Sequence, residues 1–312
     1  MEVQLVVTDD TQTTLVSIGE LARRTGLAVR TLRFYCDEGI LDACRSVGGH
    51  RLFEARTAVE RVLLIKRLRA LGLGLASITE VLRRERSIAE AVAEESARLD
   101  VEMRTLAWRR ASLRAVEAAS PTGRAERLAL LAAAQDGGSA HESLVRFWLG
   151  TLAPIPPDDV EGWIGWNVPR PPIDPSVEEV VAYAALVAMV SDPALKVIVR
   201  QQYWRGRAEL VRDPRELYGR IGDVMADVVP LVSAGVRPSG GRELDRFVDA
   251  HAGARGECDT PRFRARLLDE ATDGDQRIHR YWTLTEQLLG ARITVGRAHD
   301  WVYRALVDSL GR

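Results

Sequence analysis

Apolar and polar residues alternate with helical spacing in two short stretches near the start of the 312-residue chain. The first stretch places three apolar residues on one helical face: Ile18, Leu21 and Ala22. Ser17 and Glu20 have the spacing of a capping box at its start, and Gly26 supplies the positive φ that suits its end. A second helix is predicted from about Val29 to Glu38. Two short helices with a tight glycine-containing turn between them form a helix-turn-helix.

The second predicted helix carries hydrogen-bond donors of the kind that DNA accepts. Arg30 and Thr31 lie near its start, where the side chains of a helix-turn-helix reach base edges. Arg33 and Tyr35 lie further along, where flanking phosphates are the expected partners. Tyr35 has an alternative role as a half-buried core aromatic, and we expect Phe34 to belong to the core.

A short basic hairpin is predicted directly afterwards, over residues 45–53, with two glycines at its turn. A hairpin in this position makes the helix-turn-helix a winged module. Arg45, His50 and Arg51 on this wing can reach phosphates or an adjacent minor groove. His50 is equally suited to a role in the turn alone.

The helix predicted from 54 to 71 adds three basic residues: Arg56, Lys66 and Arg67. They are candidates for contacts with the DNA backbone, and as exposed charges they are equally suited to keeping the surface solvated. A glycine break at residues 72–74 and one further short helix complete this part of the chain.

A seven-residue period marks the long helix predicted over residues 87–118. Its apolar positions form one stripe: Ile88, Val92, Leu99, Leu106, Leu113 and Val116. This period is typical of a two-helix coiled coil, which predicts a homodimer. Charged residues at Glu95, Glu102 and Arg109 interrupt the stripe, so the contact is narrow. The alternative is that the stripe packs on the C-terminal part of its own chain.

These motifs, taken in order, resemble the MerR family of bacterial transcription regulators over roughly residues 16–118. The stretches that carry the resemblance are IGELARRTG, RTLRFY, GHRLF and RLRALGLGLASITEVL. The resemblance implies an antiparallel dimer helix and binding to a pseudo-palindromic spacer in double-stranded promoter DNA. It also implies that distortion of this spacer realigns the promoter for RNA polymerase holoenzyme. Two departures from the family pattern, Ala28 at the helix cap and Cys36 in place of an acidic residue, affect only the strength of the second helix.

The remainder of the chain is predicted to be helical. Residues 119–139 are expected to be a linker, and residues 140–312 an all-α bundle of six or seven helices. Four helix starts are indicated by a capping residue followed by proline: Asp174-Pro175, Asp192-Pro193, Asp213-Pro214 and Thr260-Pro261. A proline-rich loop is expected over residues 153–175.

Aromatic residues are concentrated in this predicted bundle, where they suit a pocket for a bulky organic ligand. The candidate ligand contacts are six: Trp163, Trp166, Tyr203, Trp204, Tyr281 and Trp282. The first two are the preferred candidates because they fall in the predicted loop, where a lid can form. The alternative is that these residues form the core of the bundle.

Charge is unevenly distributed along a chain whose formal net charge is −1. Residues 17–85 contain thirteen Lys and Arg against eight Asp and Glu, whereas the part after residue 118 is acidic. A basic head joined to an acidic body suits a DNA-binding module linked to a domain that does not bind DNA. Three separated cysteines and five scattered histidines give no metal-site or iron–sulfur spacing, and no catalytic motif is present, so neither cofactor nor enzyme activity is expected.

The sequence therefore predicts a mainly α protein in five parts: a flexible tail (1–16), a winged helix-turn-helix (17–85), a dimer helix (86–118), a linker (119–139) and a helical sensing domain (140–312). Without a signal peptide or an apolar run of membrane-spanning length, we expect it in the cytoplasm, at the nucleoid. The predicted function is DNA-binding transcription regulation tuned by a small organic effector. The alternative is a ligand-independent regulator whose bundle binds a protein partner or RNA polymerase.

Overall fold

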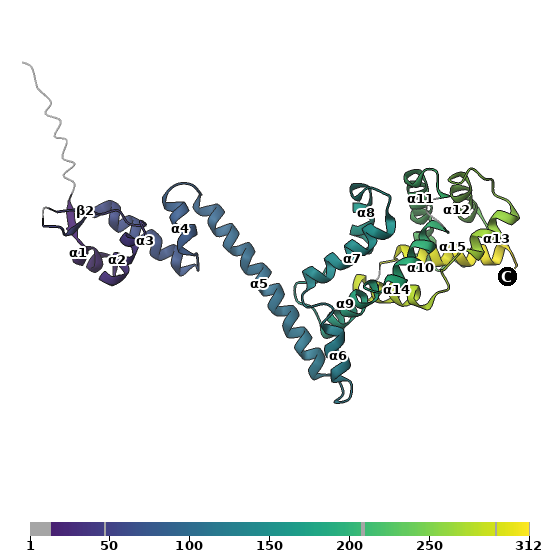
Figure 1. Cartoon of the computed structure of the whole chain (residues 1–312), viewed down its shortest axis with the longest axis horizontal. Coiled ribbons are helices and arrows are strands. Elements are labelled where there is room, and N and C mark those ends of the chain that lie inside the picture. Colours follow the sequence, from purple (N-terminus) through teal and green to yellow (C-terminus); the bar gives the residue numbers. More distant parts are fainter. Residues whose placement is uncertain (1–13, 47, 207–209, 291, 312) are drawn as a thin grey trace, which may run out of the picture. The chain divides into compact units, whose positions relative to one another are not determined.

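A computed structural model describes residues 14–46, 48–206, 210–290 and 292–311. Helices predominate over these ranges, and the chain divides into two compact units, one ending at Glu102 and the other beginning at Met103 (Figure 1). The mainly α fold class is confirmed. Each unit is described by itself below.

The first unit is built from a small sheet and short helices. Its elements follow one another as β1 (Leu15–Ser17), α1 (Ile18–Thr25), α2 (Val29–Asp37), β2 (Cys44–Arg45), β3 (Arg51–Glu54), α3 (Ala55–Ala70), α4 (Leu75–Leu82) and the start of α5 (Ile88–Glu117). Both predicted short helices, the hairpin and the helix after it are present within one or two residues of their predicted ends. The further short helix, for which no ends were predicted, is α4. The second unit contains the rest of α5.

The sheet has three strands in the order β1-β3-β2, with both pairings antiparallel. Val16 lies opposite Phe53 and is buried with it in the core. This pairing differs from the prediction, which placed residues up to 16 in a flexible tail. The short apolar run at residues 3–7 lies outside the described residues.

The joint between α1 and α2 follows the glycine signal. Gly26 has φ 70° and its N–H donates to the Ala22 carbonyl at 2.9 Å. Ser17 accepts from the Glu20 N–H at 3.3 Å, as half of the predicted capping box requires. The Glu20 carboxylate instead accepts from Arg23 and Arg24, which lowers the pKa of Glu20. The cap is therefore one-sided.

One apolar core holds these elements together. Its fully covered side chains come from every helix and from the central strand, among them Leu21, Leu32, Phe53, Val62, Ile65 and Ile78. Because Leu32 and Phe53 belong to the same core as α3, the position of α2 and of the wing is fixed by apolar burial. The core thus presents α2 with one face covered and the other open.

Helix α5 has two faces with different surroundings. In the second unit, Trp108, Ala111 and Ala115 are buried, and the Trp108 indole donates to the Ala134 carbonyl at 3.0 Å. The predicted stripe lies on the opposite side, where Leu106 and Leu113 are 57% and 63% exposed.

The second unit is an all-α assembly. Its further helices are α6 (Arg124–Leu131), α7 (Gly137–Leu152), α8 (Pro157–Asn167), α9 (Val177–Val190), α10 (Pro193–Trp204), α11 (Pro214–Ser233), α12 (Arg242–Gly253), α13 (Pro261–Asp269), α14 (Gln276–Leu289) and α15 (Val295–Ser309) (Figure 1). Nine of them lie in the described part of the chain from residue 137 onward, more than the six or seven predicted. Helix α9 packs against α7 and α14, and α11 packs against α12 and α15.

Three of the four predicted proline starts are confirmed. Asp192, Asp213 and Thr260 each cap the helix whose first residue is the following proline. The fourth was wrong, because α9 begins after Ser176, which forms a full capping box with Glu179.

The predicted linker and proline-rich loop both contain helices. Helix α6 occupies the middle of residues 119–139, and α8 occupies much of 153–175, with a proline at its first position. The lid expected around Trp163 and Trp166 is therefore a helix.

No single helix in the described ranges is long and apolar enough to span a membrane. Helices α9 and α10 meet that length and composition only when joined, across a bend of 83°.

Candidate nucleic-acid interface

Helix α2 presents arginines on its open face. Arg30 and Arg33 are exposed, Thr31 is half-buried, and Leu32 is fully covered on the opposite side. Within the described residues, neither arginine side chain has a hydrogen-bond or ion-pair partner. Two cationic side chains that are not neutralised by the protein are available to phosphates and base edges.

The two aromatic residues of α2 have exchanged the roles expected of them. Tyr35 is only 7% exposed and packs in the core, so its prediction as a phosphate contact is not supported by its position. Phe34, expected in the core, is 43% exposed. The helical period explains the exchange, since Tyr35 lies one turn from Leu32 on the buried face, whereas Phe34 follows Arg30 and Arg33 on the open face.

The N-terminus of α2 lacks a side-chain cap, as the alanine at position 28 predicts. The Ala28 side chain has no oxygen that could accept a capping hydrogen bond, and its carbonyl accepts from the N–H groups of Thr31 and Leu32. The first-turn N–H groups of α2 therefore receive no side-chain oxygen at this cap. Cys36 is half-buried, and burial raises the pKa of its thiol.

The wing contributes one further unpaired arginine. Arg45 and His50 are exposed, and the turn is closed by the Ser46 N–H donating to the His50 carbonyl at 2.9 Å. Gly49, at φ 79°, provides the left-handed residue that this turn requires. Arg51 is different, because its guanidinium donates to Asp37 at the end of α2 with a distance of 2.6 Å. Arg51 therefore joins the wing to α2.

The three basic candidates on α3 separate into distinct roles. Arg56 is paired with Glu60 at 3.2 Å, and Lys66 Nζ donates to the Thr25 carbonyl at 3.4 Å, where it caps the end of α1. Arg67 is exposed and has no partner among the described residues. Sequence reasoning missed Arg61, which donates to the Ile40 carbonyl at 2.9 Å and so supports the chain after α2.

The predicted dimer stripe is largely open to solvent. Its exposed members are Ile88, Val92, Leu99, Leu106 and Leu113. Val116 is the exception, since it packs against the core of the second unit. Of the stripe residues, only Val116 packs on the C-terminal part of its own chain, as the alternative proposed for the whole stripe.

The six aromatic residues predicted as ligand contacts are mostly core. Tyr203, Trp204 and Tyr281 are buried, and the hydroxyl of Tyr281 accepts from the Trp148 indole at 2.6 Å. Trp163 packs on Trp148 with ring centroids 4.3 Å apart.

Of the remaining two, Trp166 is exposed, whereas Trp282 is 7% exposed and belongs to the core. Trp166 is half-exposed beneath the Arg292 guanidinium, at 4.7 Å from its ring, and its indole donates to the Ile293 carbonyl at 3.4 Å. The small exposed part of Trp282 lines a cavity described below.

Acidic, histidine and cysteine side chains do not gather in a metal-binding group anywhere in the part of the chain that the structure describes. Cys44 and Cys258 are exposed, whereas Cys36 is half-buried.

Comparison with known proteins identifies the first unit. A family model described as MerR HTH family regulatory protein matches residues 16–85. Nodulation protein NolA of Bradyrhizobium elkanii is 38% identical over 87 residues, which cover 28% of this chain and 39% of that protein. A protein named HTH-type transcriptional activator SoxR homolog, from Chromobacterium violaceum, is 37% identical over 67 residues, covering 22% of this chain and 45% of that protein.

The chain thus matches less than half the length of these curated relatives. No solved structure matches it. The family match, the helix-turn-helix and the wing coincide in the first unit, and residues 16–85 therefore belong to the MerR HTH family of regulatory proteins.

Proposed function

We propose that the protein is a DNA-binding transcription regulator of MerR type that acts as a homodimer. The observation that carries this proposal is the placement of Arg30, Arg33 and Arg45, all exposed and without a described partner, on α2 and the wing of a MerR HTH domain. Nearby arginines are committed to protein partners, as Arg51 is to Asp37 and Arg24 is to Glu20. Net positive charge is thus left where a winged helix-turn-helix meets DNA.

The α5 stripe supports the dimer. Leu99, Leu106 and Leu113 repeat every seven residues and are exposed. Covering them with a second helix would lower the free energy by removing their apolar surface from water. A second copy of α5 supplies an apolar face of the same spacing. A dimer carries two recognition helices, which suits a pseudo-palindromic site.

The family resemblance supplies the regulatory step of the proposal. Binding bends and untwists the promoter spacer so that RNA polymerase holoenzyme can engage both promoter elements. Smooth bending of such a site costs about 1–6 kcal/mol, which phosphate contacts from two wings and two recognition helices offset. An organic ligand bound to the second unit changes the output if it binds the relaxed and distorted complexes unequally.

Footprinting with the purified protein on its own upstream region, followed by run-off transcription on the same fragment, tests the proposal. We expect a protected stretch centred on a spacer between promoter elements and a change in transcript level. Absence of protection at low salt, where electrostatic binding is strongest, would refute DNA binding. Protection without any transcript change would leave a DNA-binding protein and refute the regulatory step.

A further inference from the structure

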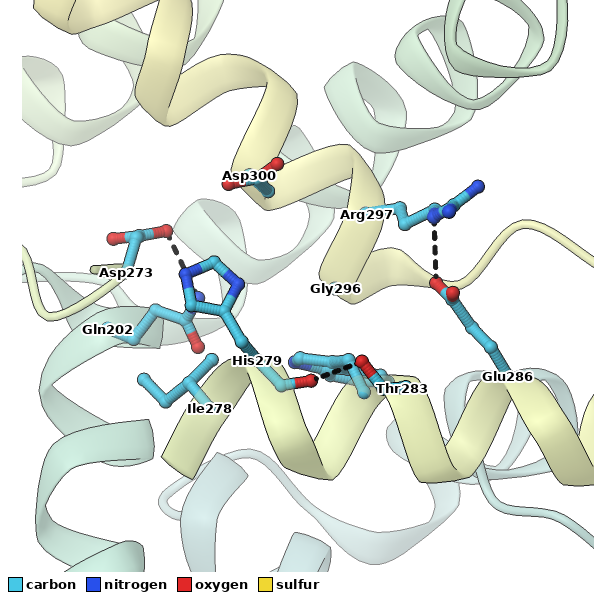
Figure 2. A pocket seen from close by; sticks show the side chains of 10 residues that line it. Gln202, Asp273, Ile278, His279, Thr283, Glu286, Gly296, Arg297 and Asp300 are labelled. Carbon is cyan, nitrogen blue, oxygen red and sulfur yellow. Dashed lines mark hydrogen bonds and ion pairs between the residues drawn. The ribbon is translucent and has the colours of Figure 1, made fainter. Parts of the chain in front are cut away.

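A cavity of about 190 Å³ lies in the second unit between α14 and α15. Its inner end is formed by Gln202 of α10 and by Asp273, which lies between α13 and α14. Figure 2 shows this pair beside the His279 ring, with Asp300 above that ring and the Arg297–Glu286 pair on the other side. The cavity is smaller than the pockets that hold drug-sized molecules, so it does not fit the bulky ligand that the aromatic content suggested.

The inner end offers an oxygen acceptor that the protein leaves unused. Gln202 is 6% exposed, and its Nε2 donates to Asp273 Oδ1 at 3.0 Å. This bond fixes the orientation of the amide, so its Oε1 is the remaining polar atom, and no described group donates to it. Because Gln202 lines the cavity, this amide oxygen is open to it and can accept a hydrogen bond from a ligand or from solvent.

The position of this amide is determined by a buried ion pair. Asp273 accepts from Arg205, whose Nη2 lies 3.1 Å from Asp273 Oδ1, and both side chains are fully covered. Arg205 therefore neutralises Asp273 and holds it in place for Gln202. The inner end is rigid and does not need to rearrange before it accepts a hydrogen bond.

Two carboxylates line the cavity with oxygens to spare. Asp300 binds Arg304 through Oδ2 at 3.0 Å, and no described group donates to its Oδ1. Glu286 uses Oε1 for both the Thr294 hydroxyl and Arg297, at 3.0 and 3.2 Å, and its Oε2 has no described partner. Apart from the exposed His279 ring, which can donate or accept, the lining groups without partners are thus acceptors, and the one arginine in the lining is paired with Glu286.

An indole forms the apolar wall of the cavity. Trp282 lines it and lies against Gly296 of α15 so closely that a Cβ at position 296 would be 2.1 Å from the indole Cδ2. Glycine at this position is therefore what allows the indole to lie flat against α15. With its face covered by α15 and only 7% of the residue exposed, Trp282 contributes a small apolar surface to the lining, against which a short carbon chain can pack.

We infer that this cavity binds a small organic ammonium ion. Its N–H groups donate to Gln202 Oε1 and to the Asp300 carboxylate, since an ammonium has three donors and no acceptor. Its carbon atoms pack on the exposed part of Trp282, and Oε2 of Glu286 offers a further acceptor at the other end. This inference names the chemical class of the organic effector in the proposed function. Ammonium binding itself does not depend on that proposal, whereas an effect of binding on transcription does.

Binding is tested on the full-length protein by isothermal titration calorimetry and tryptophan fluorescence with propylammonium chloride as the probe. Propanol, the neutral analogue, is titrated in parallel at matched ionic strength. We expect saturable heat and a fluorescence change with propylammonium and neither with propanol. Equal responses to the two compounds, or no saturable response to propylammonium, would overturn the inference.

Variants locate the site. Asp300→Asn removes the charge at a half-buried position and should weaken propylammonium binding on the order of tenfold to a hundredfold, the loss expected for a charged hydrogen bond. Asp308→Asn, an exposed change on the same helix, is the matched control and should bind as the wild type does. Thr283→Phe fills the cavity from its exposed side and should abolish binding without disturbing the core. Wild-type affinity in both Asp300→Asn and Thr283→Phe would place the ligand elsewhere.

Alanine, as the free amino acid, distinguishes two sources of the same ammonium group. Tighter binding of alanine than of propylammonium would assign the site to amino acids, and the reverse to simple amines; either result supports ammonium recognition. Operator binding is then measured with and without the better probe. Ammonium binding without an effect on DNA refutes the regulatory part of the proposed function, whereas intact DNA regulation without ammonium binding refutes only this inference.

Discussion

Salt dependence of DNA binding gives the sharpest test of the arginine assignments. The change is Arg45→Ala on the wing, where the guanidinium is exposed and has no partner among the described residues. Each phosphate neutralised by a protein cation contributes about 0.9 to the slope of log K against log salt concentration. A dimer loses one such contact per protomer, so the slope should fall in magnitude by about 1.8.

The size of this effect is easily measured. When the salt concentration rises from about 50 to 200 mM, a slope difference of about 1.8 means that the operator affinity of the wild type falls by roughly tenfold more than that of Arg45→Ala. Operator binding of wild type and variant is measured by fluorescence anisotropy at five or six salt concentrations across that range. Circular dichroism confirms that the variant is folded.

Arg23→Ala is the matched control for this experiment. Arg23 is also an exposed arginine of the helix-turn-helix, but it pairs with Glu20, which Arg24 continues to hold after the substitution. Its slope should therefore equal that of the wild type. An unchanged slope in folded Arg45→Ala, or an equal fall in Arg23→Ala, would show that freedom from protein partners does not identify the DNA contacts.

Three further outcomes follow from the same structure. Arg30→Ala should cost about 1–3 kcal/mol of operator binding and relax sequence choice at one position per half-site, which a binding-site selection experiment measures; an unchanged preference would remove Arg30 from base readout. Asp at both Leu99 and Leu106 should give monomers in light scattering, because charge replaces exposed stripe leucines, and a dimer mass would exclude the stripe as the interface. Burial and the nearby Arg205 lower the pKa of His299 to about 4, although Asp273 acts in the opposite direction. As the pH falls below about 6.5, the unfolded chain therefore binds a proton at His299 that the folded protein does not yet bind, which favours unfolding. His299 should therefore contribute a loss of about 3 kcal/mol of stability between about pH 6.5 and 4 in urea titrations, in addition to the loss from buried His251, whose pKa is also lowered. His299→Leu should lose less than the wild type, and equal losses would contradict this cause.

The first unit was predictable because its signals are local. A capping serine, a glycine at a helix end and an apolar residue each turn decide α1 and α2 without reference to the rest of the chain. The roles of Phe34 and Tyr35 were predicted from residue type, an apolar ring for the core and a hydroxyl for phosphate, and the helical period was not used. Counting from Leu32 places Tyr35 on the buried face, so this error was avoidable.

The side-chain partners of the basic residues were not predictable. Arg51 and Asp37 are fourteen positions apart, and Lys66 caps α1 from forty-one positions away. These bonds exist because the core brings wing, α1 and α3 together, so the sequence alone cannot separate Arg51 and Lys66 from Arg45 and Arg67. The structure makes that separation, and with it the choice of variants above.

In the second unit, glycine and proline misled the prediction of loops. Prolines at residues 154, 156 and 157 suggested an irregular segment, yet Pro157 occupies the first position of α8, where its missing N–H is not needed. The cavity between α14 and α15 could not be predicted at all. Gln202, Asp273 and Asp300 are separated by many residues. They line one cavity only because α10 packs against α14 and because Trp282 of α14 lies against Gly296 of α15.

Helix α5 provides a physical connection through which the second unit can influence the proposed dimer. Leu106 and Leu113 of the exposed stripe lie within two residues of Trp108 and Ala111, which are buried in the core of the second unit. The Trp108 ring lies 5.5 Å from that of Tyr183 on α9, a helix that also packs against α14, where the ammonium cavity is found. A ligand that shifts α14 therefore acts on contacts that end on the same turns of α5 as the dimer stripe. The coupling can be no larger than the difference in ligand affinity between the two dimer states, so a tenfold change in operator binding requires about 1.4 kcal/mol of such difference.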